Sequence, residues 1–113
     1  MECVVLAPGE TQKIHTGISV KIESGYFGGI YARSGLATKQ GLRPCNCVGV
    51  IDSDYIGEII VALHNDSDKT RIVNEGDRVA QLIIQKYEKV DFNEVESLEE
   101  TDRGSGGFGS TGK

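Results

Sequence analysis

Apolar and polar residues alternate along several short segments of this chain. The alternation is clearest between residues 17 and 23, where Ile18, Val20 and Ile22 are separated by polar side chains. A period of two residues is typical of a strand that buries one face. We therefore expect strands over residues 17–23 and 26–32, joined by a short turn that contains serine and glycine.

Two nearly uncharged runs follow, at residues 45–51 and 57–65, and both predict strands with little exposed surface. Residues 52–55 between them are turn-forming, so we interpret the two runs as a hairpin with two carboxylates and a phenol at its tip. A turn rich in polar residues separates two further expected strands, at residues 70–73 and 79–87.

The apolar period of a helix is almost missing from the chain. Only residues 93–101 offer a candidate helix, and Val95 and Leu98 are its sole apolar positions of the right spacing. Six or more short strands without a helical crossover predict an all-β fold, either a barrel or a sandwich.

Composition agrees with one small globular domain. The chain has 113 residues, of which 38% are apolar and 26% charged. Its formal charge of −5 opposes general nucleic-acid binding. Because no apolar run approaches the roughly 20 residues of a membrane helix and the start lacks the features of a signal peptide, we expect a cytoplasmic protein that binds no membrane. Three cysteines are too few for a disulfide scaffold or a four-ligand zinc site, so we expect small buried residues or free thiols at Cys3, Cys45 and Cys47.

Glycine divides the chain into two parts. Five of the 15 glycines fall in the last ten residues. We therefore expect a β-barrel domain over residues 1–102 and a flexible arm over residues 103–113, which has too few apolar side chains to hold itself in place. The single aromatic residue of this arm, Phe108, indicates that the arm has a surface to bind.

Few individual side chains stand out as candidates for chemistry. Asp52 and Asp54 lie two residues apart and would point to the same side of an extended segment. Gln81 interrupts an aliphatic run, and an unpaired amide facing the core would cost about 1–3 kcal/mol. Its side chain therefore either points outward or meets a ligand or partner. His15 and His64 are isolated in the sequence and receive no catalytic role.

Four segments, taken in order, resemble four of the five ordered motifs of the trimeric dUTP diphosphatases (dUTPases). They are Ala-Arg-Ser-Gly-Leu-Ala at 32–37, Gly-Val-Ile-Asp-Ser-Asp-Tyr-Ile-Gly-Glu at 49–58, Gly-Asp-Arg-Val-Ala-Gln-Leu at 76–82, and Arg-Gly-Ser-Gly-Gly-Phe-Gly-Ser-Thr-Gly at 103–112. Ala32 stands where the family commonly has proline, and Ile56 where it often has arginine. The family's first motif, Ala-Gly-x-Asp-Leu, is not found in these 113 residues.

The resemblance implies a β-barrel or jelly-roll fold and hydrolysis of dUTP to dUMP and pyrophosphate, assisted by Mg²⁺. Asp52 would orient and deprotonate the water that attacks the α-phosphorus, and Tyr55 would pack under the deoxyribose and leave no room for a 2′-hydroxyl. The uracil-binding positions implied are mostly backbone groups, from Gly49, Val50 and Gly57, with a polar contribution from Asn46.

The resemblance also implies how the triphosphate is bound. Arg33 and Arg103 supply positive charge, Ser34 lies near the leaving pyrophosphate, and Gln81 contacts the α-phosphate. The arm would close over the site, with Phe108 stacked on uracil. The positions implied for phosphate binding and closure are Arg33, Ser34, Gly35, Gln81, Arg103, Phe108, Gly109, Ser110 and Thr111.

We assign no metal ligand, because Mg²⁺ would be held mainly by the substrate phosphates and by the Asp of the first motif. Without that motif we expect a weaker metal-triphosphate complex and slower turnover, with uracil recognition less affected. The partners implied are dUTP and two further copies of the chain, since three subunits share each site in a homotrimer.

Two other functions remain open at this point. The related dCTP deaminases share the fold, but they use a Glu base and an Arg-Ser-Ser-rich motif, whereas this chain has Arg33-Ser34-Gly35 and the pair formed by Asp52 and Tyr55. A dUTPase-like regulatory protein that binds nucleotide with weak turnover is the second alternative. A purely structural barrel is the weakest interpretation, because it needs neither Arg33 nor the glycine-rich arm.

Overall fold

Short β-branched and aliphatic runs between glycine and polar turns form an all-β fold, as the sequence predicts. The computed structural model describes residues 3–109. Within this range the elements are β1 (Val4–Leu6), β2 (Thr11–His15), β3 (Tyr26–Tyr31), the π-helical turn η1 (Leu36–Gln40), β4 (Leu42–Pro44), β5 (Gly49–Ile51), β6 (Ile60–Asn65), β7 (Arg71–Val73) and β8 (Gln81–Lys86).

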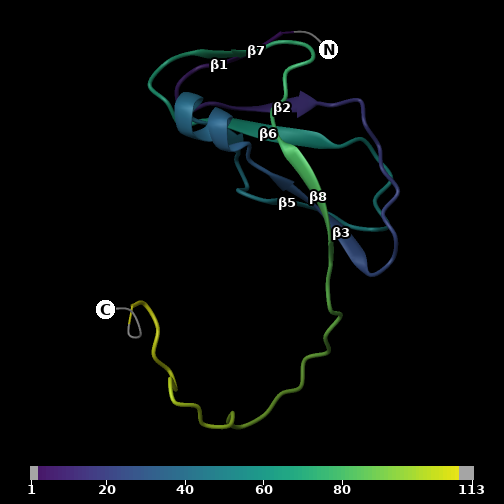
Figure 1. Cartoon of the computed structure of the whole chain (residues 1–113), viewed down its shortest axis with the longest axis vertical. Coiled ribbons are helices and arrows are strands. Elements are labelled where there is room, and N and C mark those ends of the chain that lie inside the picture. Colours follow the sequence, from purple (N-terminus) through teal and green to yellow (C-terminus); the bar gives the residue numbers. More distant parts are fainter. Residues whose placement is uncertain (1–2, 110–113) are drawn as a thin grey trace.

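The strands form three small antiparallel sheets (Figure 1). Their strand orders are β2-β6-β4, β5-β3-β8 and β1-β7. Side chains of β6 alternate in burial, so that Val61 and Leu63 face the core while Ala62 and His64 face outward. Ile14 of β2 lies opposite Val61, which joins the buried faces of these two strands.

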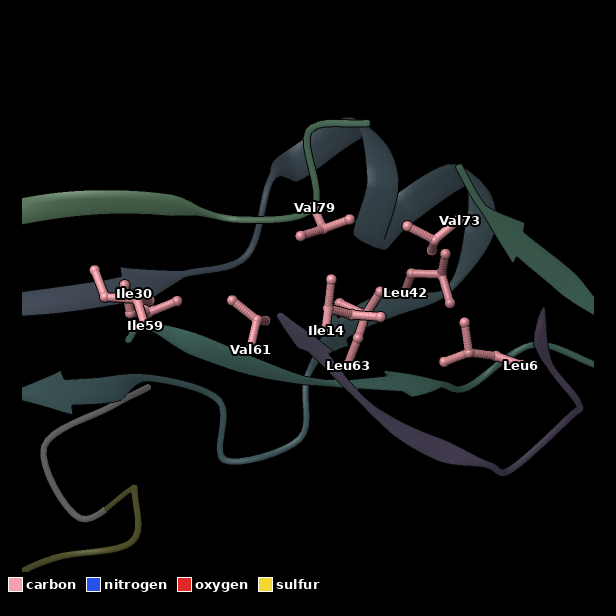
Figure 2. Close-up of a cluster of buried hydrophobic side chains, with 9 residues drawn as sticks. All are labelled: Leu6, Ile14, Ile30, Leu42, Ile59, Val61, Leu63, Val73 and Val79. Atoms are coloured by element: carbon pink, nitrogen blue, oxygen red, sulfur yellow. The ribbon is translucent and has the colours of Figure 1, made fainter. Parts of the chain in front are cut away.

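A cluster of aliphatic side chains fills the space between the sheets. Leu6 and Leu63 are completely buried, and Figure 2 shows the side chains of the cluster gathered between strands β1, β2, β3, β4, β6 and β7. The cluster consists of Leu6, Ile14, Ile30, Leu42, Ile59, Val61, Leu63, Val73 and Val79. Its residues come from strands of all three sheets, so the sheets share one core.

One polar side chain, Asn65, is completely buried at the end of this core. Its Nδ2 donates to the carbonyl oxygens of Leu6 (3.0 Å) and Lys69 (2.8 Å). Its Oδ1 accepts from the amide (2.9 Å) and hydroxyl (2.7 Å) of Ser67. These bonds compensate for burial and tie β1 and the turn after β6 together.

Three of the strand and helix predictions are wrong. Residues 17–23 bury Ile22 but form no strand, because their backbone makes only isolated bonds, such as Ile59 N to Ile18 O at 2.8 Å. Residues 45–51 contribute only β5, and β5 and β6 do not form the expected hairpin, since β5 pairs with β3 while β6 pairs with β2 and β4. Residues 93–101 are not helical.

After β8 the chain leaves the sheets as an extended segment without strands or helices up to residue 109 (Figure 1). The radius of gyration is 18.8 Å, whereas a compact chain of this length has about 13 Å. Large apolar side chains on the segment are exposed, among them Phe92 and Leu98. No helix in the described part of the chain is long and apolar enough to cross a membrane.

Candidate active site

The loop between β5 and β6 presents Asp52 and Tyr55 to solvent. Tyr55 N donates to Asp52 O at 3.1 Å, so the two residues sit at the ends of one tight turn. Both line a cavity of about 220 Å³, together with Val50, Ile51, Glu58 and Ile60. An exposed carboxylate and an aromatic ring therefore border the same space.

The orientation of the Tyr55 ring is set by its neighbours. Its hydroxyl donates a 2.6 Å hydrogen bond to the carbonyl oxygen of Glu58. A Cβ atom at Gly57 would lie 2.7 Å from the Tyr55 hydroxyl oxygen and 2.9 Å from the ring carbon that carries it. The ring therefore packs over Gly57 in a space that only glycine leaves free.

Glu58 is a residue of this site to which the sequence analysis gave no role. Its Oε1 lies 2.9 Å from His15 Nδ1, and its Oε2 accepts from the Gly17 amide at 2.9 Å. The hydrogen bond with His15 and then that with Gly17 hold the pKa of Glu58 below its usual value. Glu58 is the last residue of the segment at 49–58, so the motif included the residue although no role was assigned to it.

A second cavity, of about 200 Å³, also borders β5. Asn46, Gly49 and Val50 line it, along with core residues of β3 and β6. The Asn46 Nδ2 atom would lie 3.3 Å from a Cβ at Gly49, so this amide packs closely against the strand backbone. Val50 borders both this cavity and the one at Asp52, which places the predicted uracil positions next to the predicted catalytic loop.

A third cavity, of about 510 Å³, contains a different set of predicted residues. Arg33 and Gln81 both line it. Gln81 is exposed, and its Nε2 donates to Ala32 O at 2.8 Å, so the amide points outward and is fixed next to the Arg33 backbone. Ser34 and Gly35 are exposed at the start of η1, where Thr38 Oγ1 donates to Ser34 O at 2.8 Å.

The predicted site residues are thus divided between separate parts of one chain. Asp52 and Tyr55 line the 220 Å³ cavity, while Arg33 and Gln81 line the 510 Å³ cavity. Phe108 is fully exposed on the C-terminal segment, and Arg103 Nε donates to Gly106 O within that segment at 2.6 Å. Gly109 is exposed with a positive φ, and the predicted Ser110 and Thr111 lie outside the described residues.

The carboxylates of the loop between β5 and β6 suit a metal ion that is bound mainly by substrate phosphates. Within residues 3–109, no group of three or more His, Cys, Asp or Glu side chains is placed to hold a metal ion. Mg²⁺ usually keeps several waters and binds through one or two carboxylates plus substrate phosphates. The exposed carboxylates of Asp52 and Asp54 are compatible with that mode of binding.

Comparison with known proteins assigns the chain to a family. The dUTPase family model matches residues 1–112. A deoxyuridine 5'-triphosphate nucleotidohydrolase of Corynebacterium glutamicum is 51% identical over 110 residues, which cover 96% of this chain and 74% of that protein. One from Finegoldia magna is 50% identical over 109 residues and covers 96% and 76%.

Solved structures agree with the family model. The dUTPase of Staphylococcus bacteriophage 80alpha, solved with dUPNHPP, has a TM-score of 0.89 at 30% identity, covering 99% of this chain and 82% of that one. The dUTPase of phage phi11 of S. aureus has a TM-score of 0.79 at 29% identity, covering 88% and 80%, and a variant of it shows the coordination of a structural Mg(II) ion. The chain described here belongs to the dUTPase family.

Proposed function

We propose that this chain is a dUTP diphosphatase, which cleaves dUTP to dUMP and pyrophosphate by attack of water on the α-phosphorus. The observation that carries the proposal is the turn in which Asp52 and Tyr55 border one cavity, in a chain that belongs to the dUTPase family. Its curated relatives are named for this reaction.

Asp52 is the proposed general base. An exposed carboxylate is ionised at neutral pH and can accept a proton from a water held within hydrogen-bond reach. The turn from Asp52 to Tyr55 keeps that carboxylate at the edge of the cavity that receives the sugar. Asp52 therefore activates the water while the rest of the loop orients the nucleotide.

Selection of base and sugar belongs to the strand and loop around Asp52. The Tyr55 ring is the platform for the deoxyribose, and its packing over Gly57 leaves little freedom to make room for a 2′-hydroxyl. Backbone groups of Gly49, Val50 and Gly57, with the Asn46 amide, are the proposed contacts to uracil. Such a site rejects cytosine because its buried polar groups would stay unpaired.

The triphosphate requires positive charge, because the chain as a whole is acidic. We assign this role to Arg33 and Arg103, assisted by the Ser34 hydroxyl and the Gln81 amide. Bound Mg²⁺ would supply charge neutralisation and Lewis-acid chemistry at the triphosphate. Residues 103–113, beyond the segment that leaves the barrel after β8, are the proposed closing arm, with Phe108 over the uracil and with Ser110 and Thr111 at the γ-phosphate.

A homotrimer would bring the separated parts of the site together. Asp52 and Arg33 line different cavities of one chain, so a site that uses both can be completed by a neighbouring copy. Exposed apolar side chains support this assembly, because such patches mark protein contacts. They are Leu82, Ile83 and Ile84 on β8 and Val90, Phe92, Val95 and Leu98 on the segment after it.

A pyrophosphate-release assay tests the proposal. The purified chain is incubated with dUTP, dTTP, dCTP or UTP, each with Mg²⁺ and with EDTA. We expect pyrophosphate release from dUTP that depends on Mg²⁺. Its rate should be well above the rates with dTTP, dCTP and UTP. Equal rates with UTP would reject the assigned selectivity, and deamination of dCTP would favour the alternative enzyme.

A further inference from the structure

A tight turn joins β4 to β5 and carries two cysteines. Cys47 N donates to Pro44 O at 3.0 Å, and Val48 N donates to Asn46 O at 2.7 Å. Cys47 has φ +66°, a left-handed conformation that is uncommon outside glycine. The chain therefore reverses direction around Asn46 with one thiol on either side of it.

The Cα spacing of Cys45 and Cys47 is within reach of a disulfide. Residues two positions apart have Cα atoms at most about 7 Å apart even in an extended chain, and a turn shortens this distance. Disulfides join Cα atoms that are about 4.4–6.8 Å apart. Cys45 and Cys47 are both free and exposed, as is Cys3.

Arg43, whose Nε forms a 2.6 Å ion pair with Asp66, holds the backbone of the turn beside the two cysteines. Its Nη1 donates to Pro44 O at 3.2 Å and to Cys45 O at 3.4 Å. The hydrogen bond and charge of Asp66 raise the pKa of Arg43, and the nearby sulfurs of Cys47 and Cys45 act in the same direction.

We infer that Cys45 and Cys47 form a modification site at which a low-molecular-weight disulfide oxidises the pair to an intramolecular disulfide. One thiolate attacks a sulfur of the reagent, the reagent's S–S bond breaks, and one thiol leaves with a proton. The second cysteine attacks the mixed disulfide, the bond between Cys45 and Cys47 forms, and the second thiol leaves. Two electrons pass from the pair to the reagent.

A disulfide between Cys45 and Cys47 should also change the adjacent 200 Å³ cavity. The expected effect on dUTP binding rests on the proposed function. Asn46 lies between the two thiols and lines the 200 Å³ cavity with Gly49. Its Nδ2 would lie 3.3 Å from a Cβ at Gly49, so the amide is next to the β5 backbone. A disulfide that tightens the turn should therefore displace Asn46 and raise the KM for dUTP several-fold, with a smaller change in kcat because Asp52 lies beyond β5.

Mass analysis of the full chain after treatment with glutathione disulfide tests the site directly. We expect the wild type to lose two hydrogens within the peptide that holds Cys45 and Cys47, with no glutathione retained there. Cys45→Ser and Cys47→Ser should each retain one glutathione on the remaining thiol, because the second exchange step is removed. Cys3→Ser is the matched control and should form the internal disulfide as the wild type does.

Stable glutathione adducts on wild-type Cys45 or Cys47, or no reaction at either, would overturn the modification site. The mass readout does not depend on dUTP hydrolysis, so it remains decisive even if the chain lacks that activity. The link to the nucleotide cavity is tested separately by the KM before oxidation, after oxidation and after dithiothreitol. A reversible rise that Cys45→Ser abolishes supports the link, and an unchanged KM in fully oxidised protein overturns it.

Discussion

The hydroxyl of Tyr55 donates to the backbone carbonyl of Glu58 across the two intervening residues, at 2.6 Å. The Glu58 carboxylate is held in turn by His15 and by the Gly17 amide. The aromatic platform proposed for the deoxyribose is thereby connected to β2 on the barrel. Its orientation depends on residues that need not touch the nucleotide.

Gly57→Ala should disturb this platform. The new Cβ would lie 2.7 Å from the Tyr55 hydroxyl oxygen, so the ring must move. We expect the ratio of dUTP to UTP turnover to fall by about tenfold or more, which corresponds to about 1.4 kcal/mol. Steady-state kinetics with both nucleotides measure this ratio.

A double-mutant cycle provides the control for Gly57→Ala. In a Tyr55→Ala background the added methyl group no longer meets the ring, so Gly57→Ala should cause little further loss of selectivity. Full additivity of the two substitutions would show that Gly57 acts by some route other than Tyr55.

The Glu58 interactions should make stability depend on pH. A pKa that is lower in the folded chain means that the ionised form stabilises the fold. This contribution is complete above the unfolded value of about 4.3 and disappears as pH falls through the folded value. Glu58→Gln should therefore lower Tm at pH 6 to 7, and the difference from wild type should shrink below about pH 4.

Thermal melts of both proteins across this pH range provide the measurement. Glu94→Gln is a matched control, because Glu94 is exposed on the segment after β8 and should give a small, pH-independent difference. A Glu58→Gln difference that grows as the pH falls would contradict the assigned sign.

Sequence patterns predicted the parts of the fold and site that depend on local order. The segment at 49–58 places Asp52 and Tyr55 on one turn, as expected. The pairing of strands could not be predicted, because alternation indicates which face of a strand is buried and not which strand lies beside it. The runs ending at Ile51 and Asn65 therefore resembled a hairpin, although their strands belong to different sheets.

Contacts between residues far apart in the chain could not be predicted either, because local patterns do not indicate which strands pair. His15 and Glu58 are 43 residues apart, and only the pairing of β2 with β6 brings them together. Ile22 is buried without a strand around it, whereas Ile18 of the same alternating run is exposed, so the alternation in this segment marked neither a strand nor a buried face. Gln81 was ambiguous because its partner, the carbonyl of Ala32, lies 49 residues earlier in the chain.

Asn65→Ala should destabilise the barrel without touching the proposed site. The substitution leaves the carbonyl groups of Leu6 and Lys69 without their buried donor. Loss of such bonds typically costs about 1–3 kcal/mol. Urea denaturation should show this decrease in the free energy of unfolding, and Asp68→Ala, an exposed change in the same turn, should lie within about 0.5 kcal/mol of wild type.

Removal of residues 103–113 should lower dUTP turnover without affecting the fold. The buried cluster ends at Val79, and the described part of the arm buries no large apolar side chain. We expect circular dichroism and oligomeric state to be unchanged while dUTP turnover falls at least a hundredfold. Phe108→Ala in the full chain should cause part of this loss, and unfolding of the truncated protein would show that the arm has a structural role.

The central claim is that Asp52 activates water for attack on dUTP. Its most direct test is pyrophosphate release from dUTP by the wild type, Asp52→Asn and Asp54→Asn, with nucleotide affinity measured in parallel. An amide keeps the shape of the side chain but cannot accept the proton, so Asp52→Asn should lose a factor of about 10²–10⁴ in kcat with affinity kept within several-fold. Asp54→Asn, at the other exposed carboxylate of the same turn, should stay within a few-fold of wild type. Near-normal turnover by Asp52→Asn would contradict the account.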